Sequence, residues 1–338
     1  MKVLIVGAGG MAGYTALRFS QSGAEVTIAA KGERIEQLNA GGFRMREAYS
    51  GSITSIPVRV VDSRSLDKEI TSGPVYDLVL IAVKSYQAES LLPQLKDCPP
   101  AVPIVFAGSY ATGIGDWAAE LGPDRSFFAF PGSTAVGDEE GIIEYVDRGG
   151  ESGDNWGVTL GWLRPEDVSP ESEQLFGKVE ELFRDASLPV YRSDRMQSVF
   201  LSQAAVRLPI MAAVRMTGGS LDTLYVRGDL LKLMIKGIRE SLAALKASGY
   251  SPIPSSLEMY RWVPIFMSAN MMKHRFDTTS SRVGIESFAS HASDETAFLA
   301  RQMLALAERA KTPRDHLLYL FSEFEDEDED EDEAPQDE

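Results

Sequence analysis

The residues near the start of the chain that are best suited to chemistry form the glycine-rich pattern Gly7-x-Gly9-x-x-Ala12. Glycine at position 7 lets the backbone turn sharply, glycine at position 9 lets it approach a pyrophosphate, and the small Ala12 permits close helix packing. A helix that begins here presents free N–H groups to phosphates. The alternative is a turn with only a structural role. We expect dinucleotide binding by Gly7, Ala8, Gly9, Gly10, Met11 and Ala12.

Two cations, Lys31 and Arg34, follow the second apolar run of the chain, and no acid ends that run. An acid there would bind the ribose 2′-hydroxyl of NAD and repel a 2′-phosphate, whereas cations pair with a 2′-phosphate. The pattern therefore predicts NADPH/NADP+ as the cofactor. The alternative is that both cations are solvated surface residues.

The elements that must position these residues alternate between short apolar runs and segments compatible with helices. Continuous apolar runs are typical of strands that are covered on both faces, so residues 1–192 are predicted to form an α/β domain with a doubly wound parallel Rossmann-type sheet. From about residue 196, apolar residues recur with helical spacing, as in 230–247 and 297–310. Residues 193–322 are therefore predicted to form an all-helical domain. The runs expected as strands are 2–6, 25–29, 58–61, 78–83, 103–107 and 126–130.

Charge is concentrated at the end of the chain. The 338 residues carry a net charge of −17, and residues 323–338 contain twelve acids and no bases, which leaves −5 on the remainder. Such a run repels itself and predicts a disordered acidic tail over 323–338. An acidic protein lacks the basic face that nucleic acid requires, so no nucleic-acid partner is expected.

Neither a membrane nor a metal is expected from the sequence. The N-terminus has no signal-peptide pattern, and we expect no window with the apolar length of a membrane span, which predicts a cytoplasmic protein. The three histidines, His274, His291 and His316, are 17 and 25 residues apart and show no metal-ligand spacing.

Five short segments occur in a specific order along the chain. They are Gly7-x-Gly9-x-x-Ala12, Lys31-Gly32-x-Arg34, Val83-Lys84-Ser85-Tyr86-Gln87, Thr112-Gly113-Ile114-Gly115 and Gly237-Ile238-Arg239-Glu240. In this order, and with gaps across residues 1–322, the chain resembles the ketopantoate reductase family (2-dehydropantoate 2-reductase and its relatives). The layout of the helical half also matches, with Glu295 opening the penultimate helix.

The resemblance implies roles for residues in both domains. It places Lys84 at the active site, and Lys84 also follows a predicted core strand at the sheet edge where ligands collect. The alternative for Lys84 is a solvated loop lysine. Val83, Lys84 and Thr112 are also expected to bind the cofactor. Thr112 stands where the family has a cofactor-side asparagine. Glu295 corresponds to the carboxylate that binds the substrate hydroxyl, and Ser280, Ser281 and His291 could line the same cleft.

The helical domain departs from the family at its proton donor. The family's general-acid lysine falls at Ser202, and the asparagine four residues later falls at Val206. Arg207 lies about one turn beyond Ser202, so the two could offer a hydroxyl and a guanidinium to a carboxylate or oxyanion. The alternative for Arg207 is an ordinary surface arginine. The candidate catalytic residues are Lys84, Ser202, Arg207 and Glu295.

The stretch Met259–Met272 is rich in aromatic residues and methionine. It could form an apolar wall for a bulky substrate, but such stripes more often belong to a core or a dimer interface. A homodimer through the helical domain is therefore a further expectation.

These observations predict an NADPH-dependent reductase that transfers hydride to a small carbonyl substrate, a 2-oxo acid or related compound, in a cleft between the two domains. Two alternatives stay open. One is a catalytically idle relative that binds NADPH as a sensor or scaffold, because the lysine is missing. The other is an opine- or imine-type dehydrogenase with the same two-domain layout.

Overall fold

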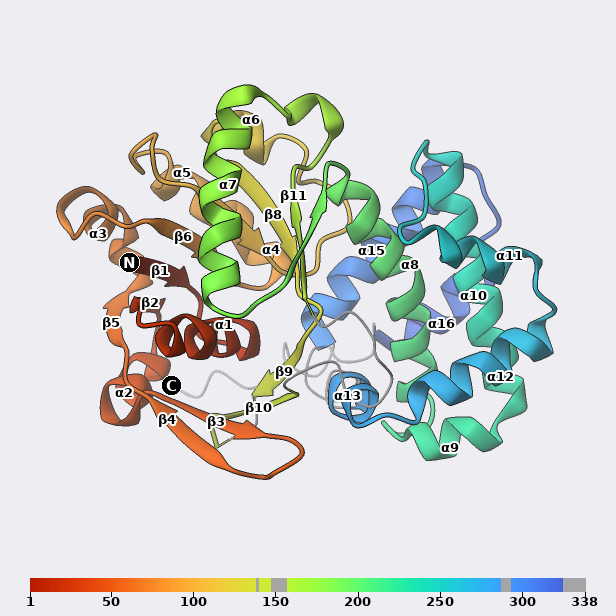
Figure 1. Cartoon of the computed structure of the whole chain (residues 1–338). Helices are drawn as coiled ribbons and strands as arrows, with labels where there is room; N and C mark the ends of the chain where they lie inside the picture. The colour runs from red at the N-terminus through yellow and green to blue at the C-terminus, as the bar shows by residue number, and fades with distance from the viewer. Residues whose placement is uncertain (138–139, 147–156, 287–292, 325–338) are drawn as a thin grey trace, which may run out of the picture. The chain divides into compact units, whose positions relative to one another are not determined.

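The structure, a computed structural model, describes residues 1–137, 140–146, 157–286 and 293–324 (Figure 1). The chain divides into two compact units. Unit 1 comprises Met1–Ser109 and Gly113–Gln197, and unit 2 comprises Tyr110–Thr112 and Ser198–Glu338. The division follows Gln197, whereas the sequence suggested residue 192.

Unit 1 is built on an eight-stranded sheet in the order β12-β11-β8-β7-β6-β1-β2-β5. All neighbours pair in parallel except β11 and β8, which are antiparallel. The central strands bury nearly every residue, as strands covered on both faces do. The predicted doubly wound sheet is confirmed. Its strands are β1 (Lys2–Val6), β2 (Glu25–Ala30), β5 (Arg59–Asp62), β6 (Leu78–Ile81), β7 (Ile104–Ala107), β8 (Ser126–Phe130), β11 (Val158–Gly161) and β12 (Val190–Ser193).

A second sheet, which the sequence did not predict, has four strands in the order β4-β3-β10-β9. Its strands are short, and β3 alternates between buried and exposed residues instead of forming a continuous apolar run. Only one face of such a strand is apolar, which explains why a search for continuous runs missed it. The strands are β3 (Phe43–Glu47), β4 (Ile53–Ile56), β9 (Thr134–Gly137) and β10 (Ile142–Val146).

Helix α1 (Gly10–Gln21) contacts both sheets. Two of its glycines allow the second sheet to approach: a Cβ on Gly10 would lie 2.1 Å from the carbonyl oxygen of Ala135, and a Cβ on Gly13 would lie 2.3 Å from Ile143 Cδ1. The glycines after the turn therefore serve packing as well as the turn itself.

The remaining helices of unit 1 are short, with one exception. Helix α7 (Pro170–Asp185) begins with a capping box, in which the Ser169 hydroxyl accepts from the Ser172 N–H and the Ser172 hydroxyl accepts from the Ser169 N–H. The shorter helices are α2 (Glu33–Gly41), α3 (Leu66–Ser72), α4 (Ser85–Ala88), α5 (Leu92–Leu95) and α6 (Trp117–Leu121).

Unit 2 is helical over its described residues, as predicted, and has its own apolar core. Helix α10 (Gly228–Ala247) packs against several of the others, including α12, α15 and α16. The other helices are α8 (Met196–Arg215), α9 (Leu221–Val226), α11 (Met259–Trp262), α12 (Ile265–Phe276), α13 (Thr279–Ser281), α15 (Ser293–Arg309) and α16 (Asp315–Phe321).

The expectation that no segment has the apolar length of a membrane span is wrong for helix α8. Among the described helices it alone is long and apolar enough to qualify, and 78% of its 18-residue apolar window is buried inside the structure. A helix that is packed on most sides must be apolar on most sides, so α8 has the composition of a core helix.

The disordered acidic tail was predicted to begin at residue 323, but residues 323 and 324 have a defined structure. A short 3₁₀ helix covers Ser322–Phe324, and Phe324 is buried, with its ring centroid 5.8 Å from that of Phe321. One aromatic side chain within the acidic run is enough to hold its first residues on the helical core. Residues 325–338 lie outside the described part of the chain.

Candidate functional site

The glycine turn follows β1 directly. Gly7 has a φ of +116°, and a Cβ there would lie only 2.2 Å from the carbonyl oxygen of Ala82, so this position requires glycine. Gly9 is the N-cap of α1 in an extended conformation, and a Cβ on it would meet nothing within 4 Å. The turn is therefore tightly packed at Gly7 and open at Gly9, beside the free N–H groups of a helix.

This turn lies at the point where the strand order reverses. The chain proceeds from β1 to β2 on one side and reaches β6 on the other, and ligands of doubly wound folds bind at the carboxyl edge of such a position. Val83 and Lys84 follow β6 there, and Val83 Cγ1 would lie 3.2 Å from a Cβ on Gly7. Lys84 is the N-cap residue of α4, with its Nζ 5.7 Å from the ring centroid of Tyr86. The structure thus brings Val83 and Lys84 to the edge that holds the glycine turn.

The two cations predicted to bind a 2′-phosphate lie at the end of β2. Lys31 is exposed. Arg34 donates from Nε to the carbonyl oxygen of Ala8 at 3.3 Å and from Nη1 to Gln37 Oε1 at 2.9 Å, which holds its guanidinium against the glycine turn. Both cations therefore belong to the same edge of unit 1 as the turn.

Ser202, in α8 of unit 2, is completely buried. Its hydroxyl donates to the carbonyl oxygen of Ser198 at 2.6 Å and accepts from the backbone N–H of Ile253 at 2.9 Å. The single proton of this hydroxyl is bonded within the helix, so the geometry favours a structural role in joining α8 to the segment around Ile253.

Arg207 and Glu295, by contrast, interact with each other. Arg207 lies in α8, and Glu295 lies in the first turn of α15. Burial lowers the pKa of the Arg207 guanidinium, and the negative charge of Glu295 opposes this shift. The carboxylate favours the charged form of the partly buried guanidinium. The two candidate residues are therefore placed to act together.

Thr112 belongs to unit 2, unlike the other predicted cofactor residues. Its backbone N–H donates to Gln302 Oε1 on α15 at 3.0 Å. Its neighbour Tyr110 is 2% exposed, and burial and the charge of Glu295 both raise the pKa of its phenol. The sequence analysis missed Tyr110, although an aromatic residue shortly after a core strand and before the Thr112-Gly113 turn was a signal that could have drawn attention to it.

Other expectations have mixed outcomes. The stripe over Met259–Met272 is partly core, since Tyr260 and Met272 are buried, but Trp262 and Phe266 are 77% and 65% exposed. Ser281 donates and accepts locally with Thr278. His291 lies outside the described residues, and nothing is described of the side chain of Ser280.

Within the described ranges no three metal-ligating side chains lie close enough together to hold a metal ion.

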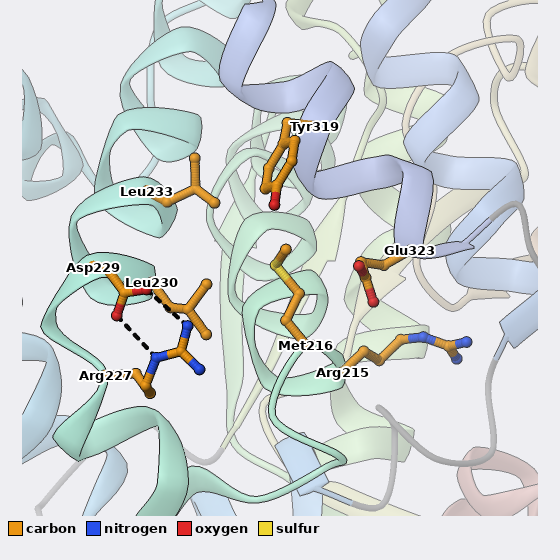
Figure 2. A pocket seen from close by; sticks show the side chains of 8 residues that line it. All are labelled: Arg215, Met216, Arg227, Asp229, Leu230, Leu233, Tyr319 and Glu323. Atoms are coloured by element: carbon orange, nitrogen blue, oxygen red, sulfur yellow. Dashed lines mark hydrogen bonds and ion pairs between the residues drawn. The ribbon is translucent and has the colours of Figure 1, made fainter.

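A cavity of about 390 Å³ opens in unit 2 at the C-terminal end of α8 (Figure 2). Arg227 pairs with Asp229 at its wall, with distances of 2.7 and 3.0 Å. Arg215 and Glu323 also line it, so the charges balance and do not favour an anion. Arg215 is eight residues beyond Arg207, about 12 Å along the helix. None of the predicted site residues lines this cavity.

The fold and the glycine turn are typical of two-domain oxidoreductases that bind a nicotinamide dinucleotide. Residues 3–107 match the model of the family described as ketopantoate reductase PanE/ApbA. The chain is similar to a 2-dehydropantoate 2-reductase of Listeria monocytogenes, with 23% identity over 84% of this chain and 86% of that protein. Another of Pyrococcus horikoshii is 27% identical over 56% of this chain, and the match spans about half, 54%, of that protein.

Solved structures with low sequence identity share the whole fold. A D-mandelate dehydrogenase in complex with NADH and anilino(oxo)acetate has a TM-score of 0.75 at 14% identity, over 98% of this chain and 99% of that one. A 2-dehydropantoate 2-reductase of Geobacter metallireducens has a TM-score of 0.72 at 15% identity, over 96% and 99%. The N-terminal third of the chain is thus similar to the ketopantoate reductase family model, and most of its length is similar at low identity to a 2-dehydropantoate 2-reductase.

Proposed function

We propose that this protein is an NADPH-dependent reductase that transfers a hydride to the carbonyl carbon of a small 2-oxo acid or related compound. The observation that carries the proposal is the glycine turn at the reversal of strand order, where Gly9 leaves space beside the N-terminus of α1. Dinucleotide pyrophosphates bind at this position in doubly wound folds. The similarity to ketopantoate reductases supports the reductase class.

The residues at the end of β2 support a preference for NADPH. This strand ends in Ala29-Ala30 rather than in an acid, and Lys31 is exposed immediately after it. Arg34 lies close by, against Ala8. Two cations at this place favour a 2′-phosphate, whereas an acid would favour a 2′-hydroxyl. The D-mandelate dehydrogenase with the same fold was solved with NADH, so the fold by itself does not require NADPH, and the preference rests on these two cations.

The proposed chemistry assigns roles to the candidate residues Lys84, Arg207 and Glu295. NADPH supplies the hydride when bound, and it leaves as NADP+. Lys84 polarises the carbonyl group and gives a proton to its oxygen as the new C–H bond forms, and solvent then returns a proton to the lysine. Arg207 binds a substrate carboxylate, and Glu295 accepts a hydrogen bond from a second polar group of the substrate. The product is the 2-hydroxy compound.

The cofactor proposal is tested by measuring the Kd of NADPH and of NADH by fluorescence. Lys31→Ala should weaken NADPH binding about tenfold, the effect of losing one charge-assisted contact, and leave NADH binding unchanged. Lys178→Ala removes an exposed lysine of α7 and serves as the matched control. Equal affinity of the unmodified protein for both cofactors would contradict the preference, and binding of neither would end the proposal.

A second candidate function is NADPH binding without turnover. The observation that favours it is the hydrogen bonding of the Ser202 hydroxyl. This residue occupies the position of the family's general-acid lysine, and its proton is bonded to Ser198. Purified protein should therefore be tested for oxidation of NADPH with ketopantoate and a panel of 2-oxo acids, ketones and imines. Turnover of any of them excludes the idle form, whereas binding without turnover supports it.

We also propose that two copies associate through the helical unit. Residues 262–272 contain no charged side chain, and Trp262 and Phe266 stand exposed at the surface. These two rings alone leave roughly 250 Å² exposed, about a third of what one partner contributes to a standard interface. Sedimentation should give a dimer mass, and replacing both rings with serine should give a monomer. Val75→Ser, at an exposed apolar residue of unit 1, should leave the mass unchanged.

A further inference from the structure

Arg34, on helix α2, contacts three other segments of unit 1. Its Nε donates to the carbonyl oxygen of Ala8 at 3.3 Å, and its Nη1 donates to the carbonyl oxygen of Gly141, just before β10, at 3.3 Å. Its Cζ lies 5.6 Å from the ring centroid of Phe43, on β3. Gln37 Oε1 accepts from the same Nη1 at 2.9 Å and orients the group from within α2. One guanidinium thus joins the glycine turn to the second sheet.

The second sheet is shaped to approach this part of the chain closely. Gly141 has a φ of +74°, and a Cβ there would lie 2.7 Å from Arg34 Nη1. The sheet also packs against the first turn of α1, where a Cβ on Gly10 would lie 2.1 Å from the carbonyl oxygen of Ala135. This contact and the Arg34 bond lie on either side of the N-cap residue of α1 along the chain. The second sheet therefore supports the glycine turn both before and after that residue.

The glycine turn gains most from such support at Ala8. The neighbouring glycines Gly7, Gly9 and Gly10 have wide conformational freedom, so the composition of the turn does not make it rigid. The carbonyl of Ala8 and the N–H of Gly9 belong to one planar trans peptide unit and point in opposite directions. A donor that holds the carbonyl therefore fixes the direction of the N–H at the start of α1. The N–H groups there are those that a pyrophosphate binds in doubly wound folds.

We infer that Arg34 is a positioning residue of the cofactor site, which fixes the glycine turn by joining the Ala8 carbonyl to the second sheet. The consequence for NADPH rests on the proposed function. A preorganised turn loses less conformational freedom when a dinucleotide binds, so its effect is the same for NADPH and for NADH. A residue that pairs with the 2′-phosphate would instead act on NADPH alone. Lys31, which is exposed, is then the cation that contacts the 2′-phosphate.

The binding test is Arg34→Lys, which keeps the positive charge but loses the planar group that donates from two nitrogens. We expect Kd to rise about fivefold for NADPH and by the same factor for NADH, as for the loss of one hydrogen bond. Arg44→Lys, at an exposed arginine of β3, is the matched control and should leave both Kd values unchanged. Weaker binding of NADPH alone would make Arg34 a 2′-phosphate ligand and overturn the inference, and so would two unchanged Kd values.

A second measurement separates this inference from the proposed function, because it needs no cofactor. The amide of Gly13 donates to the carbonyl oxygen of the N-cap Gly9 at 2.9 Å, and its hydrogen exchange should be about fivefold faster in Arg34→Lys, since the released turn opens more easily. The amide of Glu173 makes the corresponding bond to the N-cap Ser169 of α7, also at 2.9 Å, and its exchange should not change.

The two measurements together distinguish the possible failures. Unchanged exchange at Gly13 would overturn the inference even if the protein binds NADPH. Faster exchange at Gly13 alone, in a protein that binds neither cofactor, would support the role of Arg34 in the turn and reject the proposed function. Faster exchange at both Gly13 and Glu173 would mean that the substitution loosens the whole unit, which also overturns the inference.

Discussion

Unit 1 and unit 2 present their candidate functional groups in opposite ways. In unit 1 the groups are backbone N–H groups at an open glycine turn and an exposed cation, all close to strand ends. In unit 2 they are partly or fully buried side chains, where burial and the charge of Glu295 act on the pKa values of Arg207 and Tyr110. Ligand binding by backbone N–H groups depends on the local backbone conformation. The free energy of a buried polar side chain depends on the groups that contact it. The two units should therefore respond differently to substitution.

The largest effect is expected from Gly7→Ala. The new Cβ would lie 2.2 Å from a backbone oxygen, and residue 7 has a positive φ. We therefore expect the free energy of unfolding to fall by at least about 3 kcal/mol and NADPH binding to become undetectable. Gly9→Ala is the matched control, because its Cβ meets nothing within 4 Å. It should keep its Tm but bind NADPH more weakly, since the Cβ would take up space where the proposed pyrophosphate binds. Calorimetry and fluorescence titration check both, and a stable, NADPH-binding Gly7→Ala protein would refute the account of the turn.

A smaller effect is expected in unit 2 from Arg207→Met. Removing the guanidinium leaves the Glu295 charge without its counter-ion. We expect this to lower the free energy of unfolding by about 3 kcal/mol and Tm by roughly 6 to 12 °C. Adding Glu295→Gln should recover much of that loss, although neither variant should reduce substrate normally. Arg195→Met, at an exposed arginine beside Asp194, provides the control. No recovery in the double variant would show that the pair is not coupled.

The smallest effect is expected at Glu69 of unit 1, whose carboxylate accepts from Arg59 at 2.5 and 3.0 Å. The Arg59 hydrogen bonds lower the pKa of Glu69, so its stabilisation is complete above the usual glutamate range and is lost as pH falls through the lowered value. Arg59 is half exposed, which limits the effect to about 1 kcal/mol, or roughly 2 to 4 °C in Tm.

The corresponding experiment compares Glu69→Gln with the unmodified protein across pH. The Tm difference should be present at neutral pH and disappear in acid, where both side chains are neutral. Glu25→Gln, at an exposed carboxylate 3.9 Å from Lys2, should show almost no difference at any pH. A difference at Glu69 that persists in acid would mean that packing, and not charge, holds this pair.

Much of unit 1 could be predicted because its signals are local. The run of residues 2–6, the turn at Gly7 and the strand ending before Lys31 each occupy a few consecutive residues, and the structure confirms the doubly wound sheet that such alternation predicts. The second sheet was missed because its strands are half-buried and pair across long sequence separations, as β3 does with β10. No local window contains both partners.

The polar groups of unit 2 illustrate the same limit more strongly. Glu295 was named from a family resemblance and Arg207 from its helical spacing to Ser202. Tyr110 was not named, since its neighbours lie 90 residues or more away along the chain. Ser202 was named for its position, and only the structure revealed that its hydroxyl is bonded to Ser198 and Ile253.

The sequence by itself determined the fold class, the glycine turn and the cations at the end of β2, because strand pattern and backbone freedom are properties of consecutive residues. Only the tertiary structure decided which side chains face one another in the helical unit. Burial and pairing there depend on segments such as Tyr110–Thr112 that leave one unit in sequence and join the other in space. The free energy of a buried polar group is set by those neighbours, and no local pattern records them.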